Sequence, residues 1–264
     1  MRFANKVALV TGAGCVGPGW GNGRAMAVRL AQEGAQVWAV DFDPSRLAQT
    51  LALAGEHAHA IHPFQCDVTD SASVNRMVHA CAERLGGLDI LINNVGGSAP
   101  GGPLEMSEDI WDAQMNFNLK SVFLTCKHAL PLLKARGGGA IVNMASTSGI
   151  RWTGSAQVAY AAAKAGVIQM SKVMAIQHAA DHIRVNTVVP GQLHTPMVES
   201  RLAGQRSGGD VQALLKQRLA RIPLGFMGDG RDSASAALFL ASEDARFITG
   251  TEIVVDGGMT VRCG

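Results

Sequence analysis

The sequence contains little charge. Only 17% of its 264 residues are Asp, Glu, Lys or Arg, and the formal net charge is +2, whereas soluble proteins usually carry about 25% charged residues. A nucleic-acid-binding protein would show a basic face or stripe, and a disordered chain would combine high charge with few apolar residues. The low charge and the 47% content of hydrophobic residues therefore argue against both classes and predict a large buried core.

Long apolar runs, paired cysteines and metal-binding patterns are absent as well. No stretch of about 18 uncharged apolar residues occurs, which argues against a membrane span, and the N-terminus lacks the pattern of a signal peptide. The five cysteines are scattered and form no C-x-x-C pair, which favours reduced thiols in a cytoplasmic protein. His57, His59 and His62 have no carboxylate or cysteine partner at a ligand spacing, so we interpret them as surface residues and expect no metal.

Short β-branched runs alternate with helical patterns along the chain. Strands are expected at 7–10, 37–41, 59–66, 88–92, 140–144, 183–189 and 252–255. Helices are expected at 23–34, after Asp43-Pro44, at 71–85 with Asp70 as the cap, at 107–136, at 155–180 and twice more before the last strand. This alternation implies a parallel sheet, and the nearly continuous apolar strands imply that both of its faces are buried. We therefore predict a single-domain α/β fold over residues 1–264, a doubly wound parallel sheet of about seven strands with helices on both faces.

The widest break in this alternation is residues 191–230. It follows a strand end, where doubly wound sheets bind ligands, and long irregular segments usually have a function. We interpret it as a substrate lid, and an ordinary surface excursion is the alternative. His194 within it either contacts substrate or, as we favour, faces solvent. Several of its apolar residues either line a pocket or belong to the core: Met197, Leu202, Leu214, Leu215, Phe226 and Met227.

A glycine-rich turn connects the first strand to the first helix. Gly12 begins it, and Gly21 and Gly23 open the helix, where glycine lets the backbone approach a pyrophosphate at the helix N-terminus. Asp41 ends the second strand, where an acid can accept hydrogen bonds from an adenosine ribose and repel a 2′-phosphate. Phe42 follows it, so no arginine is expected there to hold that phosphate. The pattern favours NAD over NADP, and the alternative for Asp41 is a turn or cap residue.

Further short motifs follow in a specific order: Asp67-Val68, Asn93-Asn94-Val95-Gly96, Asn118, Ser146, Tyr160-Ala161-Ala162-Ala163-Lys164, Pro190-Gly191 and Asp256-Gly257-Gly258. With these motifs the chain resembles the short-chain dehydrogenase/reductase family over essentially its whole length. The resemblance implies a Rossmann-type fold, a nicotinamide dinucleotide cofactor and a homotetramer.

The resemblance also implies roles for individual residues. The catalytic set would be Asn118, Ser146, Tyr160 and Lys164. Asp67 and Val68 would lie at the adenine, Asn94 along the cofactor, and Val189 and Thr195 near the nicotinamide. Together with the glycine turn, the expected cofactor-binding residues are Gly12, Gly21, Gly23, Asp41, Asp67, Val68, Asn94, Gly96, Tyr160, Lys164, Val189 and Thr195.

The chemistry of the tyrosine and lysine can be argued from their spacing. Tyr160 and Lys164 are four residues apart, so they share one face of a helix. A tyrosine with a pKa near 10 is only about 0.1% ionised at neutral pH, and lowering that pKa by about two to three pH units needs about 3–4 kcal/mol. A lysine ammonium at about 4 Å in a partly shielded site supplies a comparable energy. The tyrosinate would take the proton of an alcohol as hydride leaves its carbon, while Ser146 holds the oxygen. Ser148 competes with Ser146 for that role, and Asn118 has the alternative of an ordinary polar helix residue.

We therefore expect an NAD-dependent oxidoreductase acting on a small to medium, partly apolar secondary alcohol or its ketone. Trp152 would wall the pocket, and Arg151 would hold an anion or face water. One alternative is an NADPH-dependent 3-oxoacyl or carbonyl reductase, which Asp41 disfavours. A second, of another class, is a catalytically silent dinucleotide-binding regulator, which the complete catalytic set disfavours. An enoyl reductase is disfavoured because its tyrosine–lysine spacing is longer than four.

The glycine turn departs from the family pattern T-G-x-x-x-G-x-G, since Val16 stands where the second glycine belongs. Aligning Gly21 and Gly23 with the last two glycines needs five inserted residues but keeps Asp41 at the usual distance, whereas Gly17 and Gly19 need one. We therefore interpret 16–20 as an extension of the phosphate-binding turn. Trp20 should pack on protein, cofactor or substrate. Two hypotheses remain open, a loop that covers the cofactor and borders the cleft, or a tryptophan that only packs on neighbouring helices.

Overall fold

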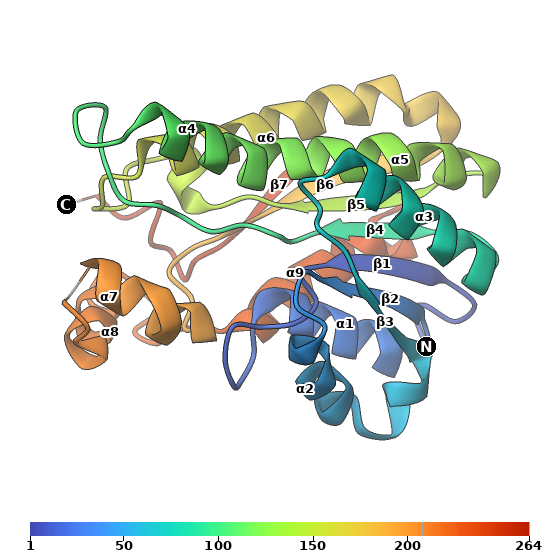
Figure 1. The fold of residues 1–264 in the computed structure, drawn as a ribbon, viewed down its shortest axis with the longest axis horizontal. Helices are drawn as coiled ribbons and strands as arrows, with labels where there is room; N and C mark the ends of the chain where they lie inside the picture. Colours follow the sequence, from blue (N-terminus) through green and yellow to red (C-terminus); the bar gives the residue numbers. More distant parts are fainter. Residues whose placement is uncertain (207, 264) are drawn as a thin grey trace.

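The computed structural model describes residues 1–206 and 208–263, so Ser207 of the expected lid and the terminal Gly264 lie outside the described residues. All of its strands are parallel and form one seven-stranded sheet in the order β3-β2-β1-β4-β5-β6-β7 (Figure 1). The strands are β1 (Val7–Thr11), β2 (Gln36–Asp41), β3 (Ile61–Gln65), β4 (Ile90–Asn93), β5 (Gly139–Met144), β6 (Ile183–Pro190) and β7 (Glu252–Val255). The strand order reverses beside β1, and the carboxyl ends of the strands at such a reversal form the ligand crevice of doubly wound sheets. The predicted fold class is confirmed.

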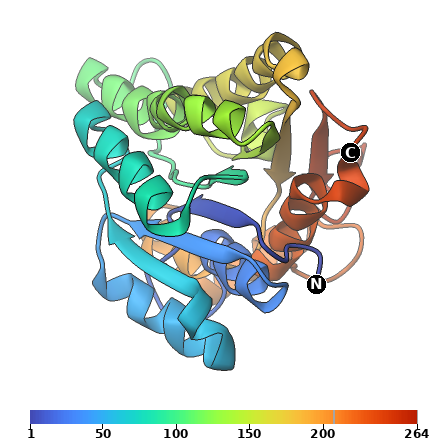
Figure 2. The same cartoon turned by 90° about the vertical axis from the view of Figure 1, so that its right-hand side faces the viewer.

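Helices cover both faces of the sheet (Figures 1 and 2). One side carries α1 (Asn22–Gln32), α2 (Ser45–Ala54) and α9 (Gly230–Ala241). The other side carries α3 (Ser71–Leu85), α4 (Glu108–Met115), α5 (Ser121–Ala135) and α6 (Val158–Gln177). Two further helices, α7 (Ala203–Arg206) and α8 (Val211–Leu219), lie apart from these layers at the lower left of Figure 1. Within the described residues, no helix is long and apolar enough to span a membrane.

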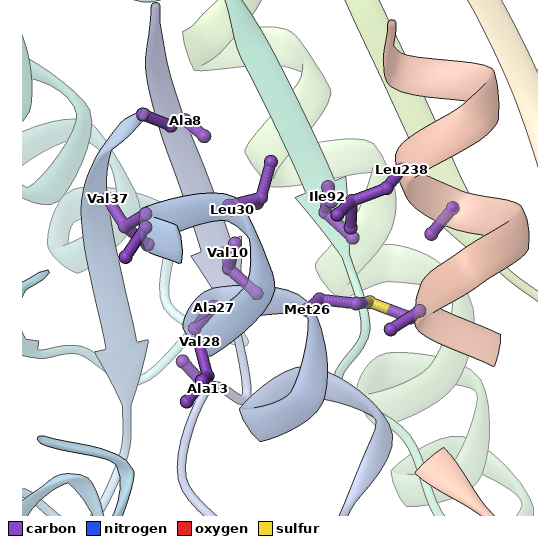
Figure 3. Close-up of a cluster of buried hydrophobic side chains, with 14 of the residues drawn as sticks. Ala8, Val10, Ala13, Met26, Ala27, Val28, Leu30, Val37, Ile92 and Leu238 are labelled. Carbon is purple, nitrogen blue, oxygen red and sulfur yellow. The ribbon is translucent and has the colours of Figure 1, made fainter. Parts of the chain in front are cut away.

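Each strand contributes to two apolar layers because successive side chains point to opposite faces. Ala8 and Val10 of β1 belong to the layer beneath α1 and α9, whereas Val7 and Leu9 belong to the layer beneath α3, α5 and α6. Figure 3 shows the first layer, in which Met26 of α1 extends toward α9. Buried small residues on both helices let them approach each other closely: Ala27, Ala31, Ala234, Ala237 and Ala241.

Several expected boundaries were wrong. The helix expected at 107–136 contains a π-helical turn at Asn116–Lys120, which separates α4 from α5. The helix expected at 155–180 begins only at Val158, because the backbone of Gln157 is not helical and forms a bridge with Gly101. Residues 55–60 form a 3-10 turn, so the third strand begins at Ile61 and ends at Gln65. The cap of α3 was predicted correctly, since the Asp70 carboxylate accepts a hydrogen bond from the Ser73 N–H at 2.7 Å.

The 191–230 segment is more regular than expected. A π-helical turn (Val198–Leu202) precedes α7 and α8. Val198 and Leu214 are buried against each other, with Leu202, Val211 and Leu215 packed around them. The segment therefore has a small apolar core of its own, which makes it a defined helical element beside the carboxyl ends of the strands.

Candidate active site

A cleft of about 360 Å³ opens at the carboxyl ends of the central strands. It is lined by residues that follow β1, β2, β4, β5 and β6 and by part of the 191–230 segment. Asn118 and Val189 were expected at the site but do not line the cleft; Val189 is fully buried within β6, and its neighbour Pro190 reaches the cleft instead. The other expected residues all line it: Gly12, Gly21, Gly23, Asp41, Asp67, Val68, Asn94, Gly96, Ser146, Tyr160, Lys164 and Thr195.

The N-terminus of α1 forms one wall of the cleft. Gly21 is its N-cap, no side chain caps this end, and its first turn contains no acidic residue, so its N–H groups and the helix dipole favour an anion there. A Cβ on Gly23 would lie 2.0 Å from the Gly12 carbonyl oxygen and 2.4 Å from Asn94 Nδ2, so only glycine fits. Asn94 Nδ2 donates to the Gly12 carbonyl at 3.0 Å. Asn94 thus holds the turn in place besides lining the cleft.

The carboxylate of Asp41 ends β2 beside this turn and is nearly buried. Its Oδ2 accepts a hydrogen bond from the Gly14 N–H at 3.1 Å, and its Oδ1 accepts one from the Asp43 N–H, also at 3.1 Å. Arg46 of α2 also lines the cleft, with Nη1 3.9 Å from Asp41 Oδ1 and Nε 3.3 Å from Asp43 Oδ2. The expectation that no arginine lies near Asp41 was therefore wrong, because α2 brings residue 46 back over the end of β2.

The side chain of Arg24 fixes the 16–20 extension by hydrogen bonds to its backbone. This side chain is 1% exposed, and its Nη1 donates to the carbonyls of Gly17 at 3.0 Å and Gly19 at 2.6 Å. Burial lowers the pKa of Arg24. Trp20 packs against the α1–α9 apolar layer, and the Arg231 guanidinium lies 5.7 Å from its ring centre. Val16 lines the cleft. Trp20 itself therefore packs on neighbouring helices, as the second hypothesis states, while the start of the loop borders the cleft. Helix α1 begins directly after Gly21, as the chosen alignment predicts.

Tyr160 and Lys164 lie on adjacent turns of α6 and both line the cleft. The Lys164 ammonium lies 5.8 Å from the centre of the Tyr160 ring, and it donates to the Met144 carbonyl at 2.9 Å. Lys164 is only 2% exposed, and this burial lowers its pKa to about 8. The pair thus places a half-buried phenol beside a buried cation, which stabilises the ionised form of the phenol.

Ser146 and Ser148 both line the cleft but differ in their contacts. The hydroxyl of Ser146, which follows β5, accepts a hydrogen bond from the Ser148 N–H at 3.2 Å. The hydroxyl of Ser148 accepts from Gln157 Nε2 at 2.6 Å and lies 3.2 Å from Thr153 Oγ1. Ser148 is thus tied into a polar network of its own, which favours Ser146 as the hydroxyl that serves a substrate oxygen.

Asn118 lies in the π-helical turn, behind the cleft wall. Its Oδ1 accepts from the Gly97 N–H at 2.9 Å, and its Nδ2 donates to the Gly97 carbonyl at 3.1 Å. A Cβ on Gly96 would lie 2.9 Å from both Asn118 Oδ1 and Lys164 Nζ, so Asn118 and Lys164 flank this glycine closely. The side chain of Asn118 therefore supports the strand-to-cleft loop and the lysine, and it does not face the cleft.

Four residues that were weighed for substrate or metal binding lie elsewhere. Trp152 is 71% exposed and does not line the cleft. Arg151 donates to the Thr260 carbonyl. His194 is exposed and lies 3.3 Å from Glu199, in agreement with the favoured solvent-facing interpretation. His62 contacts Gln36 Oε1 at 2.8 Å. No group of three or more metal-binding side chains occurs within residues 1–206 and 208–263.

The end of the cleft beside the 191–230 segment contains polar residues that the sequence did not reveal. Gln157, Gln192 and Arg218 line it and are buried, with exposed fractions of 6%, 6% and 5%. Of the apolar residues considered for this end, Met197 and Leu202 line the cleft. Leu214 and Leu215 belong to the small core of the segment, and Phe226 is exposed. No spacing pattern marks the three polar residues, because they come from three separate elements.

Comparisons with known proteins agree with this geometry. A family model described as enoyl-(acyl carrier protein) reductase matches residues 18–260. A 3-oxoacyl-(acyl-carrier-protein) reductase from Thermotoga maritima is 36% identical, covering 99% of this chain and 100% of its own. A 2,5-dichloro-2,5-cyclohexadiene-1,4-diol dehydrogenase from Sphingobium indicum is 38% identical over 98% of both chains. A crystal structure from Burkholderia xenovorans, described as a short-chain dehydrogenase/reductase, is 61% identical and superposes with a TM-score of 0.95 over 100% of this chain and 99% of its own.

Proposed function

The chain belongs to the short-chain dehydrogenase/reductase family, oxidoreductases that act on CH–OH groups, and we propose that it is an NAD-dependent dehydrogenase of a small to medium secondary alcohol. The observation that carries the proposal is one cleft with Tyr160, Lys164 and Ser146 on one wall and Asp41 at the opposite end. A purely regulatory dinucleotide-binding protein would have no use for this group, and turnover of any alcohol excludes that alternative.

The residues of the cleft suit a nicotinamide dinucleotide. The uncapped N-terminus of α1 suits a pyrophosphate, Gly23 leaves no side chain in its way, and Asp41 suits a ribose hydroxyl. When bound, such a cofactor accepts or supplies the hydride. Cys66, Asp67 and Val68 line the neighbouring wall, where we place the adenine.

Proton transfer is assigned to Tyr160. Its phenolate would take the proton from the substrate hydroxyl as the C–H bond breaks, and Ser146 would hold the substrate oxygen by a hydrogen bond. The Lys164 ammonium lies 5.8 Å from the centre of the Tyr160 ring, and a cation this close favours the phenolate over the phenol. Lys164 therefore helps Tyr160 to act as a base.

NADPH is a second candidate cofactor, and the position of Arg46 beside Asp41 favours it. Arg46 is partly exposed and pairs with Asp41 and Asp43, and pairs of this kind are worth about 1 kcal/mol or less. Its guanidinium is therefore free to turn toward a 2′-phosphate. The similarity to a 3-oxoacyl-(acyl-carrier-protein) reductase supports that alternative, whereas the buried carboxylate of Asp41, which repels a phosphate, supports NAD.

The deciding experiment compares kcat/KM for NAD and NADP with one secondary alcohol, in the wild type, in Asp41→Ala and in Arg46→Ala. Our proposal requires a preference for NAD that falls in Asp41→Ala, because a ribose acceptor and a repelling charge are both lost. A preference for NADP that disappears in Arg46→Ala would establish the alternative. Arg46→Ala is the matched variant, since it removes a charge of opposite sign from the same end of the cleft.

We also propose a homotetramer. Large apolar side chains remain exposed on the outer side of α4, α5 and α6, namely Ile110, Trp111, Phe123, Val173 and Ile176, with exposed fractions from 37% to 77%. Large apolar side chains left in water on three helices of one layer favour an association site on that layer.

A further inference from the structure

The end of the cleft beside the 191–230 segment is lined by neutral polar side chains besides its apolar ones. Four of them follow β5 or β6 in the chain: Ser148, Thr153, Gln157 and Gln192. A wholly apolar substrate would remove water from these groups without replacing its hydrogen bonds, and this costs free energy. What this end binds best therefore depends on which of their donors and acceptors are still free.

The amide oxygen of Gln192 is an acceptor without a donor. Gln192 is 6% exposed, and no described residue donates to its Oε1. Its Nε2 lies 3.5 Å from the Thr153 carbonyl, beyond the usual range of about 2.7–3.2 Å, and Arg221 Nη1 already donates to that carbonyl at 2.8 Å. The amide is thus held weakly, so a small rotation brings Oε1 to a ligand in the cleft that Gln192 lines. A buried acceptor in this state is satisfied only by a group that donates a hydrogen bond.

A hydroxyl hydrogen of the same end is also free. The hydroxyl oxygens of Ser148 and Thr153 lie 3.2 Å apart, so one of them donates to the other. Both accept from Gln157 Nε2, at 2.6 and 3.3 Å, and this leaves the second hydroxyl hydrogen unused. Among the described residues, no further acceptor is bonded to the pair. A ligand oxygen can therefore accept a hydrogen bond here.

We infer that the substrate is a diol: a secondary alcohol, or its ketone, whose second hydroxyl donates to Gln192 Oε1 and accepts from the Ser148–Thr153 pair. This inference rests on the proposed dehydrogenase function and narrows its substrate class. A hydroxyl both donates and accepts, whereas a carboxylate only accepts and an ammonium only donates. Met197 and Leu202 line the same end and pack against the carbon skeleton.

The second hydroxyl is distinct from the reacting one. The hydroxyl of Ser146 accepts from the Ser148 N–H at 3.2 Å, so its own hydrogen remains available to the reacting oxygen, which Tyr160 deprotonates in the proposed reaction. Gln192 has no part in that proton transfer. It is a specificity-determining residue, because it binds the part of the substrate that does not react.

The test replaces the second hydroxyl by a methyl group of similar size. Initial rates with the preferred cofactor, NAD or NADP, are measured for butane-2,3-diol against 3-methylbutan-2-ol, pentane-2,4-diol against 4-methylpentan-2-ol, and hexane-2,5-diol against 5-methylhexan-2-ol, with each stereoisomer taken separately. The wild type should prefer at least one diol by about 10- to 100-fold in kcat/KM, beyond the factor of about two that two equivalent hydroxyls give, because the methyl analogue leaves buried polar groups unpaired. The pair with the highest ratio reports how far apart the two hydroxyls lie.

Two variants separate recognition from a structural role. Gln192→Met should lower the diol-to-analogue ratio to the factor of about two, mainly through KM for the diol, and Gln192→Glu should restore part of it, since both protonation states of Glu keep an acceptor oxygen. Arg221→Met is the matched control, because it removes the shorter hydrogen bond to the same Thr153 carbonyl and Arg221 does not line the cleft. If Gln192 only braces the loop at Thr153, Gln192→Met will lower the turnover of diol and analogue alike, as any effect of Arg221→Met should, and the inference is then wrong.

A binding measurement keeps this inference apart from the proposed function. The enzyme–NADH complex has no hydride acceptor, so alcohols bind to it without reacting. In titration calorimetry a diol should bind this complex more tightly than its methyl analogue, and Gln192→Met should abolish the difference. Equal turnover of the diols and their analogues overturns the diol inference while the dehydrogenase proposal stands. Tighter binding of a diol through Gln192 without turnover of any alcohol overturns the dehydrogenase proposal and keeps the diol site. If Gln192→Met instead weakens the binding of NADH itself and leaves the diol preference unchanged, the amide oxygen serves the cofactor and the inference is wrong.

Discussion

Lys164 should make the fold less stable at neutral pH than an uncharged side chain of the same size would. Burial lowers its pKa from 10.5 to about 8, so the folded protein holds the ammonium less well than the unfolded chain does. At 1.36 kcal/mol per pKa unit, this difference amounts to about 3 kcal/mol. Lys164→Met removes the charge and keeps the length of the side chain, but it leaves the Met144 carbonyl without this donor, which costs about 1–3 kcal/mol.

The pH dependence of the free energy of unfolding shows whether the buried ammonium stabilises or destabilises the fold. Between about pH 8 and pH 10.5 the unfolded wild type binds more protons than the folded one, so the stability of the wild type rises with pH through this window. Below it, the full penalty of burying the charge is present. Lys164→Met lacks this dependence, so it should be about 1–2 kcal/mol more stable than the wild type at pH 7 and less stable by a similar amount at pH 10.5.

The assay is urea or thermal unfolding of both proteins at several pH values, at one protein concentration because association also contributes to stability. Lys172→Met on the same helix is the control, since its ammonium is 43% exposed and pairs with Glu252 at the surface. A Lys164→Met protein that is less stable than the wild type at pH 7, with a difference that does not change toward pH 10.5, would refute the reasoning. Its turnover should be lost in either case.

Three further predictions concern the reaction, the assembly and the loop. Tyr160→Phe should lower kcat by at least about 100-fold, the usual contribution of a general base, with NADH affinity measured by fluorescence nearly unchanged; retained turnover would contradict the mechanism. Sedimentation should give a tetramer that Phe123→Glu on α5 disrupts, and a wild-type monomer would count against it. Removing residues 16–20 should weaken NAD binding, because the loop start borders the cleft, and unchanged kinetics in an equally stable protein would show that the extension is passive.

The order of elements could be predicted from the sequence because most strands are nearly continuous apolar runs, whereas the helices show apolar residues at helical spacing. Asp70 was predicted as the cap of α3 because capping depends on residues within one turn. The π-helical turn at Asn116–Lys120 could not be predicted, because nothing local distinguishes it from the α-helices on either side. The hydrogen bonds of Asn118 to Gly97, a contact distant in sequence, give this turn its role beside the cleft.

The candidate site was predictable where its residues belong to one motif and hidden where it depends on tertiary structure. Tyr160 and Lys164 share a helix face by spacing alone. No sequence pattern identifies Arg46 or Arg218 as site residues. Arg46 reaches the cleft because of how α2 packs, and Arg218 reaches it because of how the 191–230 segment folds. Trp152 was wrongly expected to line the pocket, because it is close to Ser146 in sequence but its side chain does not point into the cleft.

Two of the buried cations near the cleft, Arg24 and Lys164, show what distinguishes a structural charge from a catalytic one. Arg24 donates to the carbonyls of Gly17 and Gly19 and lies 3.3 Å from the Thr50 hydroxyl, so its burial is offset by hydrogen bonds that shape the loop. For Lys164, the Met144 carbonyl is the one acceptor found among the described residues. A buried ammonium with so little compensation stabilises any negative charge that forms beside it, and Tyr160 is the group placed to carry that charge. The instability that Lys164 brings to the resting fold is, on this argument, the same electrostatic energy that lowers the barrier to proton transfer.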